Sequence, residues 1–330
     1  MRRPGADHLS KPPAGAGCPA RRFSFARLDG AGGRSTASRR TSDNGRVEVG
    51  FSIDPAQGLS REDELDCVRW AAELGYRSAW TPAGGDFAAF DRCLDWHQAS
   101  GLPTGIAVVP ASGQPPEFYA QHASRTWSGT GGQFVLGVGS GRMAHAPMEM
   151  GPYVEKLRRL LPRELPIYLA ALGPRMLRLA GEIADGVSLN WCSVDQVLRS
   201  RSEVERAASG AGRPNPPIAE YVRTAVDPDP AAAARALGQA IMGYALGPVA
   251  YRKHFARMGF AAELADQDSP RLTPSAGLLS GIGAWGAPGS VRHQFLQLAQ
   301  GLDCAIVRVL VSQPGDAESA RRVLEECRPI

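Results

Sequence analysis

The stretch PIYLAALGPRMLRLAGEIADGVSLNW, residues 166–191, contains a strand, a turn, a helix and a second strand in succession. The apolar run at its start predicts a buried strand that ends before Gly173. Pro174 stands at the first helical position, where proline is favoured because its missing N–H would have no partner inside the helix. Leu177 and Ala180 lie on one apolar face of this helix, and the Asp-Gly that follows predicts its end. Both strands are apolar rather than alternating, which is typical of a parallel sheet covered on both faces.

The same strand and helix unit repeats on both sides of this stretch. Strands are predicted at 47–54, 78–82, 104–110, 133–141, 165–172, 186–191, 218–226 and 304–312, each followed by a helix. Eight such units predict an α/β fold, a (β/α)8 TIM barrel with a helical insertion before the last strand. A doubly wound Rossmann sheet remains an alternative. The turn GVGSGR, residues 137–142, disfavours it because Arg142 replaces the last glycine of the dinucleotide motif G-x-G-x-x-G.

Composition narrows the class of protein. The 330 residues are 43% hydrophobic and 21% charged, which is sufficient for a large core. The net charge of +4 arises largely in the first 46 residues, so the body offers no basic surface for nucleic acid. Residues 1–45 predict a disordered basic tail, and residues 46–330 a single barrel domain.

Cysteine spacing and hydropathy indicate the compartment. The six cysteines are dispersed and lack zinc-site spacing, which predicts no metal site and a reducing environment. No apolar stretch is long enough to span a bilayer, and the arginine-containing amino terminus has no apolar core of a secretory signal. We therefore expect a cytoplasmic protein with no membrane partner.

In a TIM barrel, the carboxyl ends of the strands carry the chemistry. Asp54 follows the first strand, Thr81 the second, and Asn190 ends the sixth. The helix that begins at Pro174 would present free N–H groups and the positive end of its dipole at this mouth, which suits an anion. An ordinary strand-to-helix turn has the same pattern, so the turn chemistry alone leaves both interpretations open.

The stretch 166–191 also resembles a known family. Its Ala-Leu-Gly-Pro-Arg-Met turn, the helix ending in Ile-Ala-Asp-Gly and the strand ending in Asn-Trp are similar to the signature of the luciferase-like monooxygenase family. The similarity is greatest to its F420-dependent oxidoreductase branch, which includes methylene-tetrahydromethanopterin reductase. The resemblance extends from about Val47 to Val311. It implies a barrel that binds and orients a flavin or deazaflavin, while the cofactor carries the hydride.

The resemblance implies positions for the cofactor. Its phosphate would bind at 173–176, with backbone amides as donors. The strand 104–110 would contain a bulge with a non-prolyl cis peptide behind the cofactor ring, and Ile106–Ala107 is the predicted bond. Trp80 would line the mouth with Trp191, although Trp80 is equally compatible with a core aromatic. The cofactor-binding candidates are Trp80, Ile106, Ala107, Val108, Gly137, Gly139, Ser140, Gly141, Gly173, Pro174, Arg175, Met176 and Asn190.

Asp54 and His145 are the candidate catalytic residues. Asp54 could contact a polar substrate or cap a loop, and His145 is the only histidine near a predicted mouth. The sequence also departs from the family. The connection 141–165 is short, which reduces the substrate rim, and Thr81 stands where the sugar-phosphate dehydrogenase branch has a histidine.

These observations predict hydride transfer between coenzyme F420 and an unidentified small organic substrate. An FMN-dependent monooxygenase that uses reduced flavin and oxygen is the alternative, and a non-catalytic barrel is the second. Residues 231–301 predict a helical cap that would exclude water from the mouth, or a plain structural insertion. Homodimerisation is expected from the resemblance alone.

Overall fold

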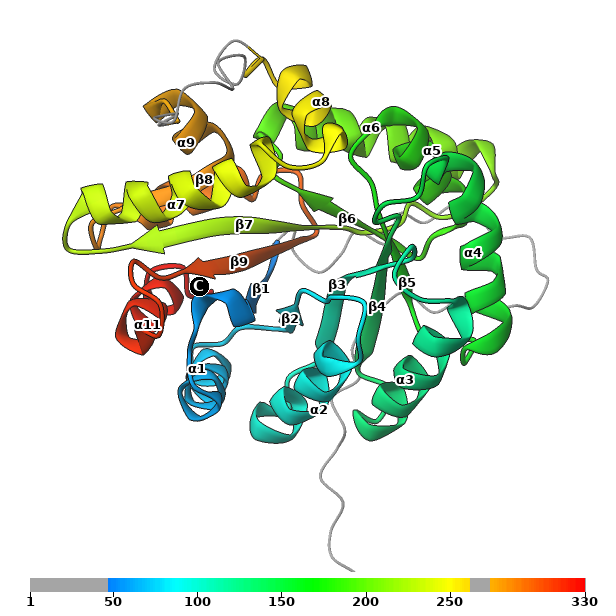
Figure 1. The fold of residues 1–330 in the computed structure, drawn as a ribbon, viewed down its shortest axis with the longest axis horizontal. Coiled ribbons are helices and arrows are strands. Elements are labelled where there is room, and N and C mark those ends of the chain that lie inside the picture. The colour runs from blue at the N-terminus through cyan, green and yellow to red at the C-terminus, as the bar shows by residue number, and fades with distance from the viewer. Residues whose placement is uncertain (1–46, 262–273, 330) are drawn as a thin grey trace, which may run out of the picture. The chain divides into compact units, whose positions relative to one another are not determined.

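The computed structural model describes residues 47–261 and 274–329 (Figure 1). The predicted tail, residues 1–45, lies outside this part of the chain. The strands are β1 (Glu48–Ser52), β2 (Ala79–Thr81), β3 (Thr104–Pro110), β4 (Phe134–Gly139), β5 (Ile167–Ala170), β6 (Gly186–Asn190), β7 (Ile218–Val226), β8 (Gly283–Gly286) and β9 (Cys304–Leu310). Strands β1 to β6 pair in sequence, β6 pairs with β7, β7 with β9, and β9 with β1, all in parallel. The eight-stranded TIM barrel predicted from the sequence is therefore confirmed.

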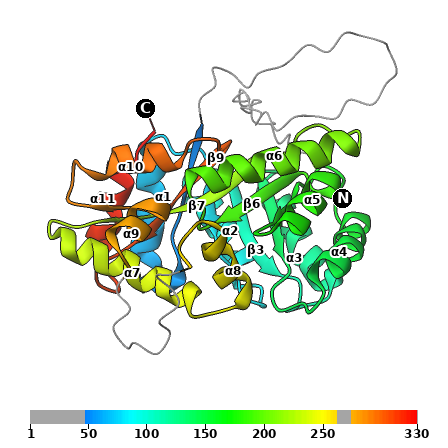
Figure 2. The same ribbon diagram turned by 90° about the horizontal axis from the view of Figure 1, so that it is seen from above.

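Helices pack against the described barrel (Figure 2). They are the short η2 (Pro55–Gln57), α1 (Arg61–Glu73), α2 (Ala88–Ser100), α3 (Pro116–Gly129), α4 (Ala146–Leu160), α5 (Pro174–Ile183), α6 (Val194–Gly210), α7 (Pro230–Ala245), α8 (Val249–Arg257), α9 (Ala276–Ile282), α10 (Val291–Leu298) and α11 (Ala317–Glu326). The predicted N-cap of α1 is confirmed, because Ser60 Oγ accepts a hydrogen bond from Asp63 N at 3.1 Å. Within the described residues, no helix is long and apolar enough to cross a membrane.

Alternate residues of each strand face opposite sides of the barrel wall. Outward side chains such as Leu136 and Val187 pack against the helices in the main core. Inward side chains fill the lumen in a separate cluster that includes Trp80 and Tyr168. The luminal position of Tyr168 requires a glycine at 186, because a Cβ atom there would overlap the Tyr168 ring.

Strand β8 was not predicted, and it divides the expected helical region 231–301. It has four residues, and it pairs with Arg223–Val226 of β7 beyond the point where β6 ends. A four-residue Gly-Ala-Trp-Gly segment is too short for its pattern to distinguish a strand from a loop. The wall of the barrel is thereby extended on the β7 side.

This extension is covered by helices on both faces. Val222 and Ala284 share the main core with α10, so α10 lies on the outer face. Ala225 instead packs in a second cluster with residues of α7, α8 and α9, which therefore lie on the luminal face. Since Leu237 of α7 is 2.7 Å from where a Gly283 Cβ would be, α7 lies directly against the inner surface of β8.

Candidate functional site

Strand β3 contains the predicted irregularity, one bond later than expected. The cis peptide joins Ala107 to Val108, so the prediction of Ile106–Ala107 was wrong by one residue. The pairing of β3 with β4 shifts register between Ile106 and Val109. Ile106 is fully buried in the outer core, whereas Ala107 and Val108 are half-buried. Of the three residues predicted to contact the cofactor ring, Ala107 and Val108 therefore have exposed surface and Ile106 does not.

The glycines of β4 make room for the neighbouring strand β3. A Cβ atom at Gly137 would overlap the carbonyl oxygen of Ile106, and one at Gly139 would lie 2.7 Å from Val108 Cγ2. Both positions thus accommodate the irregular β3. Gly141 has a φ of +60° and leads into an exposed turn, while Ser140 before it is half-buried. The prediction that these glycines allow a ligand to approach closely has a simpler packing explanation.

The amino terminus of α5 lies at the end of β5 and has the predicted features. Gly173 is the N-cap residue and provides no side chain to cap the helix, and Pro174 follows at the start. The atom nearest to a Gly173 Cβ would be Arg257 Nη2, at 3.8 Å. Arg175 is exposed and Met176 is half-buried. An uncapped helix start beside a guanidinium is suited to an anion.

Residues of α8 complete this side of the mouth. Asn190, at the end of β6, donates from Nδ2 to Tyr251 Oη at 2.6 Å. His254 Nε2 lies 2.9 Å from the Trp191 carbonyl oxygen, and Arg257 Nη2 donates to the Leu172 carbonyl at 2.7 Å. Three hydrogen bonds therefore attach α8 to the ends of β5 and β6.

The His254 ring is buried and its state follows from its surroundings. Burial, followed by the nearby Arg257 charge, lowers the pKa of His254 to about 4, although the Trp191 carbonyl opposes this. A neutral ring must donate from Nε2 to reach that carbonyl, which leaves Nδ1 to accept from Arg257 at 3.5 Å. His254 thus links the end of β6 to Arg257.

The two predicted tryptophans do not line an open mouth. Trp80 is 3% exposed and lies in the lumen between Gly50 and Gly105, with its Nε1 donating to Ser78 Oγ at 2.8 Å. It is the core aromatic of the alternative interpretation. Trp191 is fully buried under α8 and has a φ of 58°. Its ring packs against Tyr244 and Phe255 rather than facing solvent.

The predicted catalytic residues have other partners. Asp54 caps η2 by accepting from Ala56 N at 2.9 Å, and it also pairs with Arg308. His145 is exposed at the N-cap position of α4, where its backbone N–H donates to Glu149 Oε1. Asp54 therefore stays a residue of the mouth, whereas His145 lies on an exposed turn.

Sequence reasoning missed three charged residues buried in the apolar strands. They are Glu220, Arg223 and Arg308, each between 3% and 4% exposed. A charge inside an otherwise apolar strand is itself a signal, because such groups are rarely buried without a partner.

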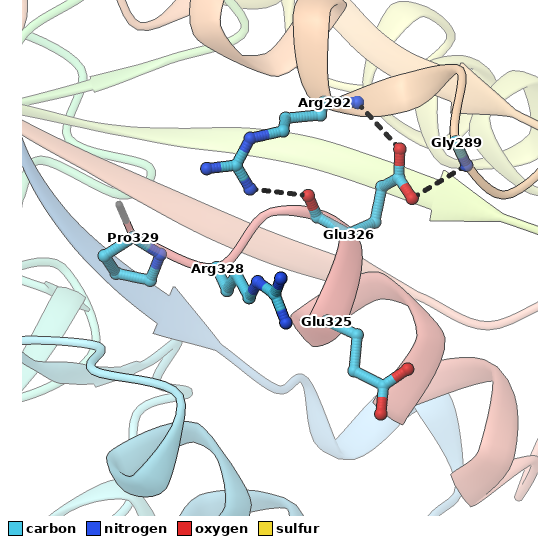
Figure 3. Close-up of a pocket in the computed structure, with 6 residues that line it drawn as sticks. All are labelled: Gly289, Arg292, Glu325, Glu326, Arg328 and Pro329. Atoms are coloured by element: carbon cyan, nitrogen blue, oxygen red, sulfur yellow. Dashed lines mark hydrogen bonds between the residues drawn. The ribbon is translucent and has the colours of Figure 1, made fainter.

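A hollow lies away from the mouth, where the end of α11 meets the start of α10 (Figure 3). In it, the Glu326 carboxylate accepts from the backbone N–H groups of Gly289, Val291 and Arg292 at 2.9 to 3.1 Å. This carboxylate caps α10 and is fully engaged. The hollow contains none of the strand-end residues, so the mouth remains the candidate site.

Comparison with known sequences supports the family resemblance. The model of the luciferase-like monooxygenase family matches residues 149–303. A 5,10-methylenetetrahydromethanopterin reductase from Methanolobus tindarius is 34% identical over 83 residues, which are 24% of this chain and 25% of that protein. The alignment thus spans about a quarter of the length of that relative.

Solved structures share the whole barrel. A coenzyme F420 dependent tetrahydromethanopterin reductase from Methanopyrus kandleri has a TM-score of 0.63 at 17% identity, covering 85% of this chain and 98% of its own. An F420-dependent secondary alcohol dehydrogenase has a TM-score of 0.62 at 14% identity, covering 86% and 98%. The FMN-bound oxygenating constituent of 3,6-diketocamphane monooxygenase from Pseudomonas putida has a TM-score of 0.60 at 15% identity, covering 86% of this chain and 98% of its own. At these identities the likeness concerns the fold, and the matched family model identifies residues 149–303 as a luciferase-like monooxygenase domain.

Proposed function

We propose that this protein is an oxidoreductase that transfers a hydride between coenzyme F420 and a small organic substrate at the mouth of the barrel. The observation that carries the proposal is the uncapped start of α5 beside Arg257, on the same side of the barrel as small, half-buried residues at the ends of β3 and β5. A flat ring with a phosphate-bearing tail needs both features, one for each end of the molecule.

The ring end fits the ends of β3 and β5. Ala107, Val108 and Ala170 have small side chains, and each exposes part of its surface. Ala170 lies 3.4 Å from where a Gly139 Cβ would be, so the two strand ends are adjacent. On the neighbouring β6, the buried Ser188 Oγ has no hydrogen-bond partner among the described residues. A polar ring edge would satisfy it.

The tail end fits α5. The backbone N–H groups of Arg175 and Met176 are in the first turn, where no intrahelical acceptor is available. The exposed side chains of Arg175 and Arg257 add positive charge at the same helix end. A phosphate there would be held by backbone amides, the helix dipole and a guanidinium.

The cofactor, when bound, supplies the hydride chemistry, and the protein supplies orientation and a dry environment. The second core of α7, α8 and α9 covers the β7 side of the mouth and would exclude water there. This is the part of the predicted cap at 231–301 that we retain. Tyr251 and Asn190 join α8 to β6 at its border.

The choice of F420 over FMN rests on similarity. The Ala-Leu-Gly-Pro-Arg-Met turn resembles the F420-dependent branch, and the sequence relative is a methylenetetrahydromethanopterin reductase. The same barrel also occurs in an FMN-bound monooxygenase, so FMN is the comparison in the test.

Equilibrium binding of F420 and of FMN to the full-length protein tests the proposal. We expect F420 to bind more tightly. Tighter binding of FMN would instead favour an FMN-dependent monooxygenase. If the folded protein bound neither cofactor, the oxidoreductase assignment would be refuted and a non-catalytic barrel would remain.

Two variants locate the site. Ala170→Leu would place a larger side chain where the ring is expected. It should weaken F420 binding by about tenfold or more, because steric clash with the ring would cost about 1.4 kcal/mol of binding free energy or more. Ala211→Leu makes the same chemical change at an exposed position after α6 and should leave binding unchanged. Equal affinities for the two variants would show that the cofactor binds elsewhere.

A further inference from the structure

Two arginines lie side by side in the lumen of the barrel. Arg223 of β7 and Arg308 of β9 are register partners on adjacent parallel strands, so their side chains point to the same face of the wall. They are 3% and 4% exposed. Like charges directly opposite each other on neighbouring strands are destabilising, and burial increases the effect.

Among the residues that the structure describes, only one of the two charges has a counterion. Arg308 pairs with Asp54 and donates from Nη1 to Ser52 Oγ at 3.1 Å. Arg223 donates from Nη1 to the neutral Asn190 Oδ1 and, at 3.4 Å, to the Tyr221 carbonyl. No carboxylate among the described residues forms an ion pair with Arg223.

The neighbours of Arg223 stabilise a cation without neutralising it. Its Cζ lies 3.8 Å from the centroid of the Trp191 ring and 5.2 Å from that of Tyr244. Such cation–π contacts stabilise a cation by far less than the cost of burying an unpaired charge. Glu220 lies three residues earlier on β7 and faces the opposite side of the strand, where its carboxylate accepts from Cys192 N.

The free part of the guanidinium is available to a ligand. The hydrogen bonds of Arg223 use Nη1 only, so Nε and Nη2 have no acceptor in the part of the chain that the structure describes. These two donors form a planar fork that matches the two oxygens of a carboxylate. Asn190, which holds Nη1, is half-buried at the mouth beside the proposed ring site.

We propose that Arg223, with Arg308 beside it, binds the carboxylate of an anionic organic substrate. This specificity rests on the proposed function, because it places the substrate in the mouth that would also hold the cofactor. The aromatic rings of Trp191 and Tyr244 flank the guanidinium and would contact the apolar part of the same molecule.

A binding experiment with defined probes tests the substrate class. The full-length protein is titrated with benzoate, hexanoate and succinate, with the matching amides, and with phenyl phosphate. We expect at least one carboxylate to bind more tightly than its amide, and Arg223→Met to weaken that binding by about tenfold or more. Arg235→Met is the control, because Arg235 lies on the exposed side of α7 and pairs with Asp229 on the surface.

A second measurement needs no ligand. If Arg223 is kept for binding, its unpaired charge destabilises the free protein, and Arg223→Met should raise the melting temperature. A structural arginine would give the opposite shift. A Met variant that melts lower than the native protein, or a native protein that binds no carboxylate more tightly than its amide, would overturn the proposal.

The cofactor titration separates this proposal from the function on which it rests. Arg223→Met should bind F420 as the native protein does, since the cofactor contacts proposed above do not include Arg223. Loss of carboxylate preference with F420 binding intact supports the substrate site. Carboxylate preference in a protein that binds neither F420 nor FMN would retain the anion site and refute only the oxidoreductase.

Discussion

The pH dependence of stability tests whether the carboxyl group of Glu220, on β7, is buried as the structure shows. Its Oε1 accepts from Cys192 N at 2.6 Å, while Oε2 has no partner among the described residues. Burial raises the pKa of Glu220 from 4.5 to about 8, and the Cys192 N–H and the Arg223 charge offset this only in part. The folded protein therefore holds this proton more tightly than the unfolded chain does.

The sign and size of the effect follow from this pKa. Below pH 4.5 the group is protonated in both states, and its contribution is fully present. As the pH rises towards 8, only the unfolded chain loses the proton readily, so stability falls. At 1.36 kcal/mol per pKa unit, the loss is roughly 3 kcal/mol at pH 7 and about 5 kcal/mol above pH 8, as an upper estimate.

Glu220→Gln removes the titration and keeps an oxygen to accept from Cys192 N. We expect the variant to gain stability over the native protein progressively from pH 5 to pH 9, measured by urea unfolding at each pH. Glu318→Gln, at an exposed position on α11, should follow the native curve throughout. If the native and Glu220→Gln curves are parallel across this range, the carboxyl is not buried as described, and the reasoning is refuted.

Three further changes test the packing and the attachment of α8. Gly186→Ala would overpack the lumen against the Tyr168 ring and should cost about 1–3 kcal/mol in urea unfolding, so an unchanged midpoint would contradict the luminal packing. Tyr76→Phe removes a buried hydrogen bond of 2.9 Å to a main-chain carbonyl and should cost about 1–2 kcal/mol by the same assay. His254, whose pKa is lowered to about 4 from 6.5, contributes stability that is present above pH 6.5 and lost as the pH falls through 4. The hydrogen-exchange protection factors of α8, which correct for the intrinsic rate at each pH, should therefore fall from pH 7 to pH 4 in the native protein, and His254→Phe should not show this fall.

The repeated strand and helix units were predictable from local pattern. Continuous apolar strands, the N-cap at Ser60 and the proline at the start of α5 each depend on neighbours within a few residues. The same local patterns predicted the uncapped helix start at Gly173. Strand β8 escaped prediction because its four residues gain their conformation from pairing with β7, which is distant in sequence.

The contents of the mouth required the tertiary structure. The sequence shows Arg223 and Arg308 as single charges in two apolar strands, but not that they are register partners on the same face. Likewise, Trp80 could line the mouth or fill the lumen, and the adjacent Gly50 and Gly105 decided for the lumen.

The physical reason for this division is the separation in sequence between the residues that interact. Periodicity and capping are set by interactions a few residues apart, so the sequence by itself determined the barrel and the anion-suited turn at the end of β5. Register between strands and the face on which a helix packs depend on contacts between distant segments. Only the tertiary structure therefore decided which charges are paired, which glycines accommodate protein atoms, and on which face of the wall α7, α8 and α9 pack.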